Sequence, residues 1–287
     1  MSLDPRRARL WHAMDLGPLW VERRSCAGVG DAAEDLVSAD AGEPAEVGAA
    51  TPPARPADWP VAAVPSLRLE FAEGLRVRLA EAGDARGAAI ARMDWNELRA
   101  SVAACVACPL CKTRTQTVFG VGHPSARWMI VGEAPGAEED ARGEPFVGQA
   151  GRLLDNMLAS IGLSRHAQDA SSVYIANVLK CRPPGNRNPE PAEAAACEPY
   201  LRRQIALVRP ALIVVMGRVA AQSLLATDAT VASLRGRVHR IVVEERLIPV
   251  VVTYHPAYLL RNLNDKAKSW ADLCFAREVY ARVANAG

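Results

Sequence analysis

The chain has 287 residues, 50% of them apolar, and a formal net charge of +2, a balance typical of a globular protein rather than of a disordered or fibrous one. No apolar run approaches the roughly 20 residues of a membrane-spanning helix, and residues 1–24 lack the apolar stretch of a secretory signal. The charge is uneven, because residues 1–92 carry a net −3 and residues 93–287 a net +5. The positive C-terminal part is compatible with a phosphate backbone as partner.

The first 92 residues divide into a short amphipathic segment and a linker. Residues 1–24 carry an apolar stripe at helical spacing, made of Leu10, Trp11, Met14 and Leu16. Residues 25–92 are rich in Ala, Pro and acidic residues, which predicts a largely disordered linker with a weak helical pattern over 75–92. Segment 1–24 is therefore expected to bind a partner or to dock on the rest of the chain.

From Asp94 onward, strand-like and helix-like patterns alternate. A helical pattern around Trp95 comes first. The strand-like runs are Trp128–Val131, Val173–Leu179, Leu212–Met216 and Ile248–Thr253. The helical runs are Leu153–Ile161, Glu190–Val208, Val219–Leu225 and Lys266–Val283. This alternation predicts an α/β domain over residues 93–287, three-layer α/β/α with a short, mainly parallel central sheet. In such sheets the functional residues lie at the carboxyl ends of the strands.

Four cysteines give the strongest chemical signal. Cys105 and Cys108 form a CxxC pair, and Cys181 and Cys197 follow at a distance. Such a set can form a thiolate cage for a [4Fe–4S] cluster or for zinc. The pair could instead be a redox dithiol, although it follows a helix rather than opening one. The four could also be unrelated buried thiols, since three further cysteines occur in the chain. In a reducing cytoplasm a disulfide framework is not expected.

The first strand-like run ends in Gly132-Glu133-Ala134-Pro135-Gly136. Backbone N–H groups of such a turn can face an anion or a water molecule, or the turn can simply connect a strand to a helix. An acidic run that includes Glu139 follows. It could complement the helix dipole, or one of its carboxylates could orient water.

Two residues further along are candidates for binding a base. Phe146 lies between turn residues, where its ring could stack on a flipped base or fill the core. Asn177 interrupts an apolar strand. Its carboxamide can donate and accept at once, as the polar edge of a base requires, or it could bond local backbone.

Basic residues and an apolar turn complete the set of candidates. Lys180, Arg182 and Arg187 surround Cys181 and could meet phosphates or solvent. His255 follows the last strand-like run and opens the segment HPAYLLR. Its imidazole could be catalytic or structural. The apolar residues beside Arg261 could wedge into a duplex or start a helix that packs on the core.

Together, GEAPG, EPFVG, the Asn177 strand running into KCRPP, CEPYL and HPAYLLR resemble family 4 uracil-DNA glycosylases, bacterial and archaeal enzymes with an iron–sulfur cluster. The resemblance covers about residues 95–283. It implies a [4Fe–4S] cluster on Cys105, Cys108, Cys181 and Cys197, with Cys111 outside the ligand set. Family 5 enzymes lack the carboxylate at the Glu133 position. Covalently trapping relatives carry a basic insertion before the motif histidine, which this chain lacks.

The resemblance also implies a mechanism in which uracil is flipped out of DNA and its N-glycosidic bond is hydrolysed. Phe146 would stack on uracil, Ala134 would line its pocket and Asn177 would read its polar edge. His255 would donate to the developing O2 anion, Glu133 would exclude thymine's methyl group, and Glu139 is the candidate for activating water. The expected DNA contacts are Arg182, Arg187, Tyr258, Leu259, Leu260 and Arg261.

The alternative is a non-enzymatic DNA-binding or replication-accessory protein on the same fold. Segment 1–24 resembles the terminal peptide through which the psi subunit of the bacterial clamp loader binds its partner, in its residues Arg6, Arg7, Leu10, Met14, Leu16, Gly17 and Trp20. The expected partners are uracil-containing DNA and, through residues 1–24, a protein of the replication machinery. The protein is expected to be a cytoplasmic, nucleoid-associated bacterial monomer without membrane contact.

Overall fold

The structure is a computed structural model that describes residues 73–78 and 85–285. Its strands form one sheet in the order β1-β6-β7-β5-β3-β4-β2. Their bounds are β1 Glu73–Arg78, β2 Val121–Gly122, β3 Trp128–Gly132, β4 Val173–Asn177, β5 Leu212–Met216, β6 Val238–Val243 and β7 Arg246–Thr253. The segment expected at residues 1–24 lies outside the described residues, as does most of the expected linker.

Four parallel strands, β4, β3, β5 and β7, form the centre of the sheet. At one edge β2 runs antiparallel to β4, and at the other β6 runs antiparallel to β7 and parallel to β1. Strands β3, β4 and β5 are buried at every position, as expected for parallel strands covered on both faces. The prediction of a mainly parallel sheet is confirmed.

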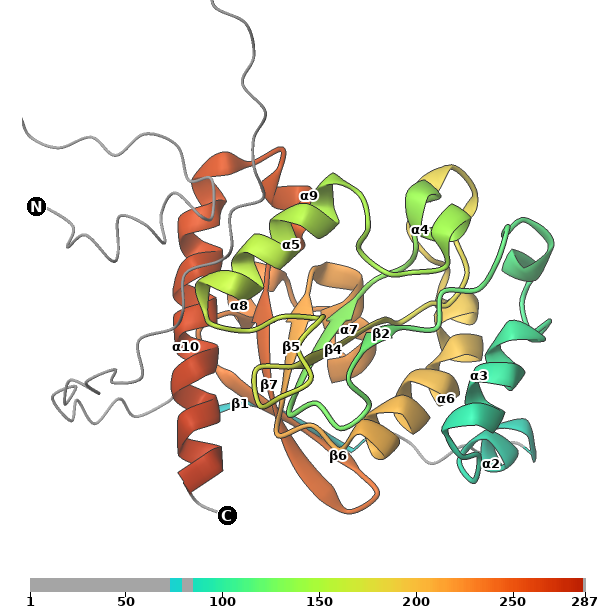
Figure 1. Cartoon of the computed structure of the whole chain (residues 1–287), viewed down its shortest axis with the longest axis horizontal. Coiled ribbons are helices and arrows are strands. Elements are labelled where there is room, and N and C mark those ends of the chain that lie inside the picture. Colours follow the sequence, from blue (N-terminus) through green and yellow to red (C-terminus); the bar gives the residue numbers. More distant parts are fainter. Residues whose placement is uncertain (1–72, 79–84, 286–287) are drawn as a thin grey trace, which may run out of the picture. The chain divides into compact units, whose positions relative to one another are not determined.

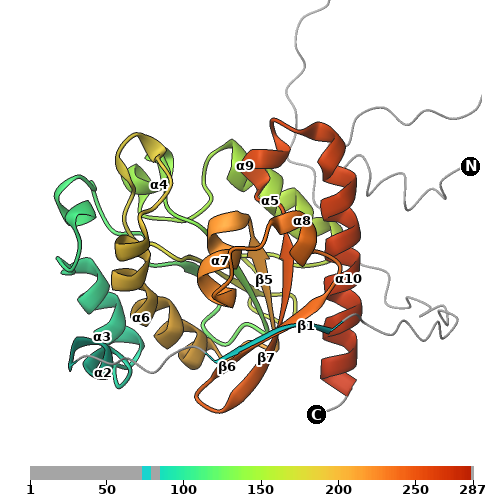
Figure 2. The ribbon, with the colours of Figure 1, turned by 180° about the vertical axis from the view of Figure 1, so that it is seen from behind.

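Helices cover both faces of this sheet (Figures 1 and 2). Helix α5 and helix α10 pack on one face, and α6 and α7 pack on the other. The longer helices are α3 Trp95–Ala103, α5 Gln149–Ser160, α6 Pro191–Val208, α7 Arg218–Leu225 and α10 Lys266–Asn285. The short ones are α2 Ala85–Ile90, α4 Ala137–Arg142, α8 Val231–Leu234 and α9 Pro256–Leu259, with 3₁₀ turns at Pro109–Lys112, Pro184–Asn186 and Leu263–Asp265. The arrangement is the expected three-layer α/β/α.

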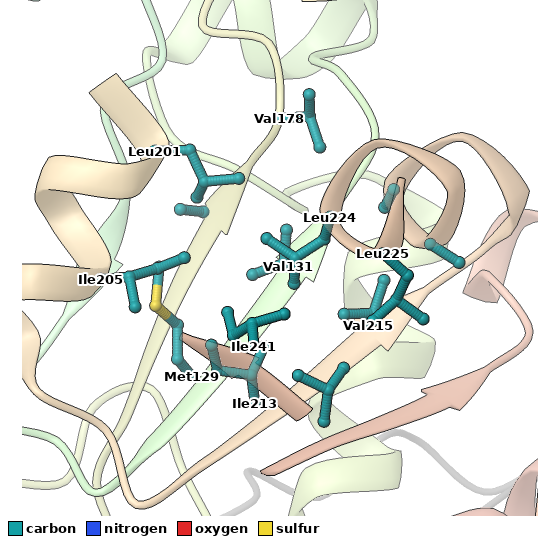
Figure 3. Packing of buried hydrophobic residues seen from close by; sticks show 14 of the residues in the cluster. Met129, Val131, Val178, Leu201, Ile205, Ile213, Val215, Leu224, Leu225 and Ile241 are labelled. Carbon is teal, nitrogen blue, oxygen red and sulfur yellow. The ribbon is translucent and has the colours of Figure 1, made fainter. Parts of the chain in front are cut away.

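The core on the α6 and α7 side illustrates how alternating strand residues are used. Figure 3 shows Met129 and Val131 of β3 beside Ile213 of β5, facing side chains of α6 and α7. The intervening residues of the same strands pack on the opposite face with α5 and α10. Because both faces are apolar, polar groups are left for the strand ends, where the sheet is no longer covered.

The N-terminal boundary of the domain differs from expectation. Residues 73–78 form β1, which pairs with β6, and residues 85–90 form α2. Helices α2 and α3 pack on the outside of α6 through Ile90, Leu98 and Tyr200. The described part of the expected linker is therefore structured, because its few apolar residues find partners on α6 and β6 that composition alone does not reveal.

The four expected strands and the four expected helices are confirmed, with small differences at their ends. Strand β6 was not expected. It forms a hairpin with β7 whose turn residues, Glu244 and Glu245, both adopt positive φ, 45° and 66°. Such turns usually carry Asn or Gly, so the two glutamates gave no indication of a hairpin in the sequence. Within the described part of the chain, no helix is long and apolar enough to cross a bilayer.

Candidate active site and thiol cage

The main cavity lies where the carboxyl ends of the parallel strands meet. It has a volume of about 830 Å³, within the usual range of ligand sites. Most of the sequence-predicted site residues line it, namely Glu133, Ala134, Glu139, Phe146, Asn177, Arg187, His255, Tyr258 and Arg261. Residues separated by more than a hundred positions in the chain are thus brought to one site by the sheet, as the strand-end argument predicts.

Asn177 ends β4 and lines the main cavity. Its side chain is 3% exposed, and its Oδ1 atom is buried without a hydrogen-bond partner. Gly132, its neighbour on β3, makes room for it: a Cβ atom there would lie 2.5 Å from Asn177 Oδ1 and 2.6 Å from the Phe146 ring. Because a buried polar atom normally has a partner, the missing hydrogen bond of Oδ1 singles out this carboxamide among the residues that line the cavity.

His255 follows β7 and caps the N-terminus of α9. Its Nδ1 accepts a hydrogen bond of 3.1 Å from the backbone N–H of Ala257, so the proton of a neutral imidazole resides on Nε2. Burial lowers the pKa of His255 to about 4; Glu139 raises it in part and Arg261 lowers it further. The side chain is therefore a neutral donor at neutral pH.

The Phe146 ring stacks on the His255 ring, with centroids 5.3 Å apart and planes at 26°. Phe146 adopts a left-handed φ of 57°, which is uncommon for an aromatic residue. The buried Arg165 steadies the loop by donating from Nη1 to the Pro145 carbonyl at 2.8 Å. Phe146 both packs in the core and lines the main cavity. Its two interpretations, a core residue and a ring that could stack on a ligand, are therefore compatible with each other.

Glu139 joins two loops of the main cavity. Its Oε2 accepts from the backbone N–H of Gly136, and its Oε1 accepts from that of Val147, each at 3.1 Å. The carboxylate therefore fixes the turn after β3 against the loop that carries Phe146. Glu133 directly follows β3, and burial raises its pKa while Arg218 opposes the rise.

The residues expected to contact DNA are divided by the structure. Tyr258 and Arg261 line the main cavity together with Arg187, whose guanidinium is paired with Glu193 at 2.6 Å. The expectation for Leu259 is wrong, because its side chain is 0% exposed and packs in the core beneath α9.

Leu260 and Arg182, which were also expected to contact DNA, lie on the surface and do not line the main cavity. Leu260 is exposed. Arg182 donates to Asn186 at 2.7 Å. The segment HPAYLLR is thus partly a helix start that packs on the core, as its alternative interpretation holds.

The four predicted cysteine ligands, Cys105, Cys108, Cys181 and Cys197, line a second, small cavity. We call these four the thiol cage. The fifth cysteine, Cys111, lines the same cavity. The cage joins three segments of chain, since two members follow α3, one follows β4 and one lies in α6. The structure therefore brings together all four residues that the sequence places in one set.

Hydrogen-bond donors surround the thiol cage. Arg114 donates from Nη1 to Cys181 Sγ at 3.1 Å, Arg86 from Nη2 to Cys105 Sγ at 3.7 Å, and the backbone N–H of Lys180 to Cys197 Sγ at 3.3 Å. Burial raises the pKa of the Cys197 thiol to about 11, with the ammonium of Lys180 opposing the rise. The surroundings thus combine desolvation, which favours neutral thiols, with donors and cations that stabilise sulfur anions.

The chemistry of this donor set fits an iron–sulfur cluster. Four thiols around one cavity supply the ligands that a [4Fe–4S] cluster takes, and N–H groups directed at sulfur are the outer contacts that tune such clusters. Among the described residues, no group of three or more His, Cys, Asp or Glu side chains has the geometry to hold a single metal ion.

Sequence reasoning missed several residues of both sites. Arg218, after β5, and Tyr254, after β7, line the main cavity, and Tyr254 stacks on Tyr258 with centroids 5.0 Å apart. Arg86 and Arg114 touch the cage from α2 and from the loop after Cys111. Arg114 could have been suspected from its place three residues after Cys111. Nothing in the sequence marks Arg86, because its contact depends on how α2 packs.

Comparison with known proteins identifies relatives of the chain. Residues 119–274 match the sequence model of the Uracil DNA glycosylase superfamily. The type-4 uracil-DNA glycosylase of Archaeoglobus fulgidus is 47% identical over 163 residues, covering 55% of this chain and 79% of that protein. The type-4 protein of Thermotoga maritima is 42% identical over 165 residues, 57% of this chain and 82% of that protein. A type-5 uracil-DNA glycosylase of Pyrobaculum aerophilum is 35% identical over 149 residues, 48% and 64% respectively.

Proposed function

Because the chain belongs to the uracil-DNA glycosylase superfamily, we propose that it removes uracil from DNA by hydrolysing the N-glycosidic bond. In this reaction the bond between C1′ of the sugar and N1 of uracil breaks, water adds its oxygen to C1′, and uracil leaves with a proton. The transition state places positive charge on the sugar and negative charge on the base. The enzyme must therefore hold a flipped base and stabilise its anion.

Asn177 carries this proposal. The carboxamide of Asn177, which lines the main cavity and whose Oδ1 atom is buried without a partner, matches the donor at N3 of uracil, while its amide nitrogen matches a carbonyl acceptor. A site built to hydrogen-bond a ligand rejects analogues that leave its polar atoms unpaired. The unpartnered oxygen thus supports a pyrimidine with an N–H next to a carbonyl as the ligand.

We assign complementary roles to the stacked pair beside Asn177. The ring of Phe146 stacks on uracil in the main cavity, beside the His255 ring that packs against it. The Nε2–H of the neutral His255 donates to the O2 oxygen as negative charge develops there. A fixed donor of this kind costs no reorganisation during the reaction.

The two glutamates have different surroundings and different proposed roles. Glu133 lines the pocket wall, where a carboxyl group would clash with the methyl group of thymine. Glu139 orients the attacking water with the lone pairs that its two backbone contacts leave. Ala134 lines the same wall without a polar group.

The basic rim and the thiol cage form the DNA-facing side in this proposal. Arg182, Arg187 and Arg261 meet phosphates, and Tyr258 and Leu260 contact the strand from which the base is flipped. Cys105, Cys108, Cys181 and Cys197 hold a [4Fe–4S] cluster. When bound, the cluster supplies a rigid cross-link between three segments; hydrolysis itself transfers no electron.

A duplex with one uracil provides the test. Purified protein is incubated with the duplex, abasic sites are cleaved with alkali, and the same duplex with thymine in place of uracil is the control. We expect strand cleavage only in the uracil duplex. Binding of both duplexes without cleavage of either would instead support the alternative, a non-enzymatic DNA-binding protein. A monomeric state, a replication partner for residues 1–24, and a cytoplasmic, nucleoid-associated location remain predictions.

A further inference from the structure

Lys180 is buried between the main cavity and the thiol cage, yet neither set of proposed roles uses its side chain. The residue is 1% exposed. Its ammonium group donates to the Asn177 backbone carbonyl at 2.7 Å and to Gln204 Oε1 at 2.6 Å. A buried charged donor carries a large desolvation cost, so a lysine at this position calls for an explanation.

The contacts of Lys180 extend through a buried polar chain. Gln204 is 0% exposed and lies on α6, the helix that also carries Cys197. Its amide nitrogen donates to the Phe119 carbonyl at 2.8 Å and to the Tyr174 hydroxyl at 3.1 Å. Because Tyr174 and Asn177 both belong to β4, Lys180 and Gln204 attach this strand to α6 at two points.

The backbone of Lys180 is held as firmly as its side chain. Its N–H donates to Cys197 Sγ at 3.3 Å, and its carbonyl accepts from the N–H of Val118 at 2.8 Å. Cys181, a member of the cage, is the next residue. Lys180 therefore contacts both the end of the strand that carries Asn177 and the sulfur atom of Cys197 in the cage.

We propose that Lys180 is a positioning residue that holds the Asn177 carboxamide in register with the base and couples this register to the thiol cage. The argument rests on the proposed function, because it assigns Asn177 to the base. Beyond Asn177 the backbone is held by hydrogen bonds from Val178 N–H to the Gly132 carbonyl and from Leu179 N–H to the Glu133 carbonyl, and Lys180 adds a contact to the Asn177 carbonyl itself. A hydrogen bond to the Asn177 carbonyl fixes the peptide on one side of Cα and so limits the directions available to the side chain.

A double-mutant cycle tests this proposal. Lys180→Met, Asn177→Ala and the double variant are compared by the single-turnover rate on uracil duplex and by the affinity for free uracil. We expect Lys180→Met to lower the rate by about tenfold or more, and to change it by less than about twofold when Asn177 is already alanine. Equal losses in both backgrounds would mean general destabilisation and would overturn the proposal, as would no loss in either.

Two further variants make the cycle robust. Lys266→Met is the matched control, because Lys266 is also buried, at 2% exposure, but lies on α10 and lines neither cavity. Its effect should be the same in both backgrounds. Gln204→Leu removes the side chain that accepts a hydrogen bond from Lys180 in the same polar chain. It takes the place of Lys180→Met in the cycle if that variant does not fold. It should lower the rate by about threefold or more, and this loss too should disappear in the Asn177→Ala background.

Measurements on the same samples separate the possible failures. Iron content and melting temperature show whether the cage is intact, and we expect Lys180→Met to retain its iron. If the parent protein does not cleave uracil duplex, the proposed function fails. If the parent cleaves and the cycle shows no coupling, only the role of Lys180 fails. Partial recovery of rate and uracil affinity in Lys180→Arg, which keeps a donor, would support positioning further.

Discussion

The main cavity and the thiol cage both lie beyond the carboxyl end of β4, yet their polar atoms have opposite surroundings. In the cavity, Asn177 Oδ1 is buried without a partner, and the imidazole of His255 keeps Nε2–H for a ligand. In the cage, the sulfurs of Cys105, Cys181 and Cys197 each accept an N–H donor. A polar group without a hydrogen-bond partner indicates where a substrate would supply one. A polar group that already has a partner in the protein indicates a contact that stabilises the fold or a resident group.

This contrast predicts that damage to the cavity affects chemistry and damage to the cage affects the fold. His255→Ala should give the largest loss of rate, since removal of one fixed donor to a developing anion typically costs about 10²–10³. The melting temperature should fall only modestly, by the loss of the α9 cap and of the stacking on Phe146. Single-turnover excision of uracil measures the effect, and His166→Ala, at an exposed position, is the control. A parental rate in His255→Ala would remove this residue from the mechanism.

Substitution in the cage should have the opposite signature. The parent, purified without oxygen, should be brown with about four irons per chain. Cys105→Ala should lose most of the iron, together with solubility and DNA binding, because three segments are no longer joined. Cys274→Ala on α10 should keep the colour.

Cys111→Ala is the sharper comparison, because Cys111 lines the same cavity as the cage and the resemblance leaves it outside the ligand set. Iron analysis and the visible spectrum of Cys111→Ala and of Cys105→Ala show which of the two cysteines holds the iron. Loss of iron in Cys111→Ala but not in Cys105→Ala would reverse the assignment. A colourless parent with stoichiometric zinc would replace the cluster with a different metal.

The pH dependence of the rate tests the neutral state of His255. Its pKa of about 4 lies below the usual value of about 6.5, so the unfolded chain takes up the proton first. The contribution of this group to stability is therefore complete above about pH 6.5 and is lost as the pH falls toward 4. The rate of the folded enzyme should remain level from pH 8 to about 5 and fall tenfold per unit below about 4. A midpoint near 6.5 would show that the imidazole is not held neutral.

Glu133 should influence selectivity more than rate. Glu133→Ala removes the proposed barrier to a methyl group, so excision of thymine relative to uracil should rise by about tenfold. Glu133→Gln keeps the volume and removes the charge, and it should retain most of the discrimination. The ratio of single-turnover rates on the two duplexes is the measurement. Unchanged ratios in both variants would place Glu133 outside the contact with C5.

The sequence predicted the sheet and most of the cavity because these depend on short-range patterns. Buried parallel strands are apolar runs, and polar residues at their ends are visible in the chain itself. Strand β6 escaped because Glu244 and Glu245 occupy a turn that usually carries Asn or Gly. Leu259 was misassigned because exposure within α9 depends on how a four-residue helix settles on the core. The contacts of Arg86 depend on packing between distant segments, which no local pattern records. For the same reason Lys180, expected to meet phosphates or solvent, is instead buried.

The smallest effect is expected from the N-terminal part of the chain. Deleting residues 1–72 should change the rate on short duplexes by less than about twofold, because a tethered segment acts through effective concentration of a partner rather than through the chemistry. Iron content and melting temperature should match those of the parent. An insoluble or inactive product would show that these residues belong to the fold, and the predicted division into a partner-binding segment and a linker would fail.

A longer deletion sharpens this last prediction, because the boundary of the domain lies earlier than the composition suggests. Removing residues 1–92 also removes β1, α2 and the guanidinium of Arg86, which donates to Cys105 Sγ and to the Ala196 carbonyl of α6. The two deletions differ by 20 residues, but the longer one withdraws a donor from the cage and a strand from the sheet edge. We therefore expect it to lose iron on exposure to air faster than the shorter one. Equal retention of iron would mean that Arg114 and the Lys180 backbone suffice to hold the cage.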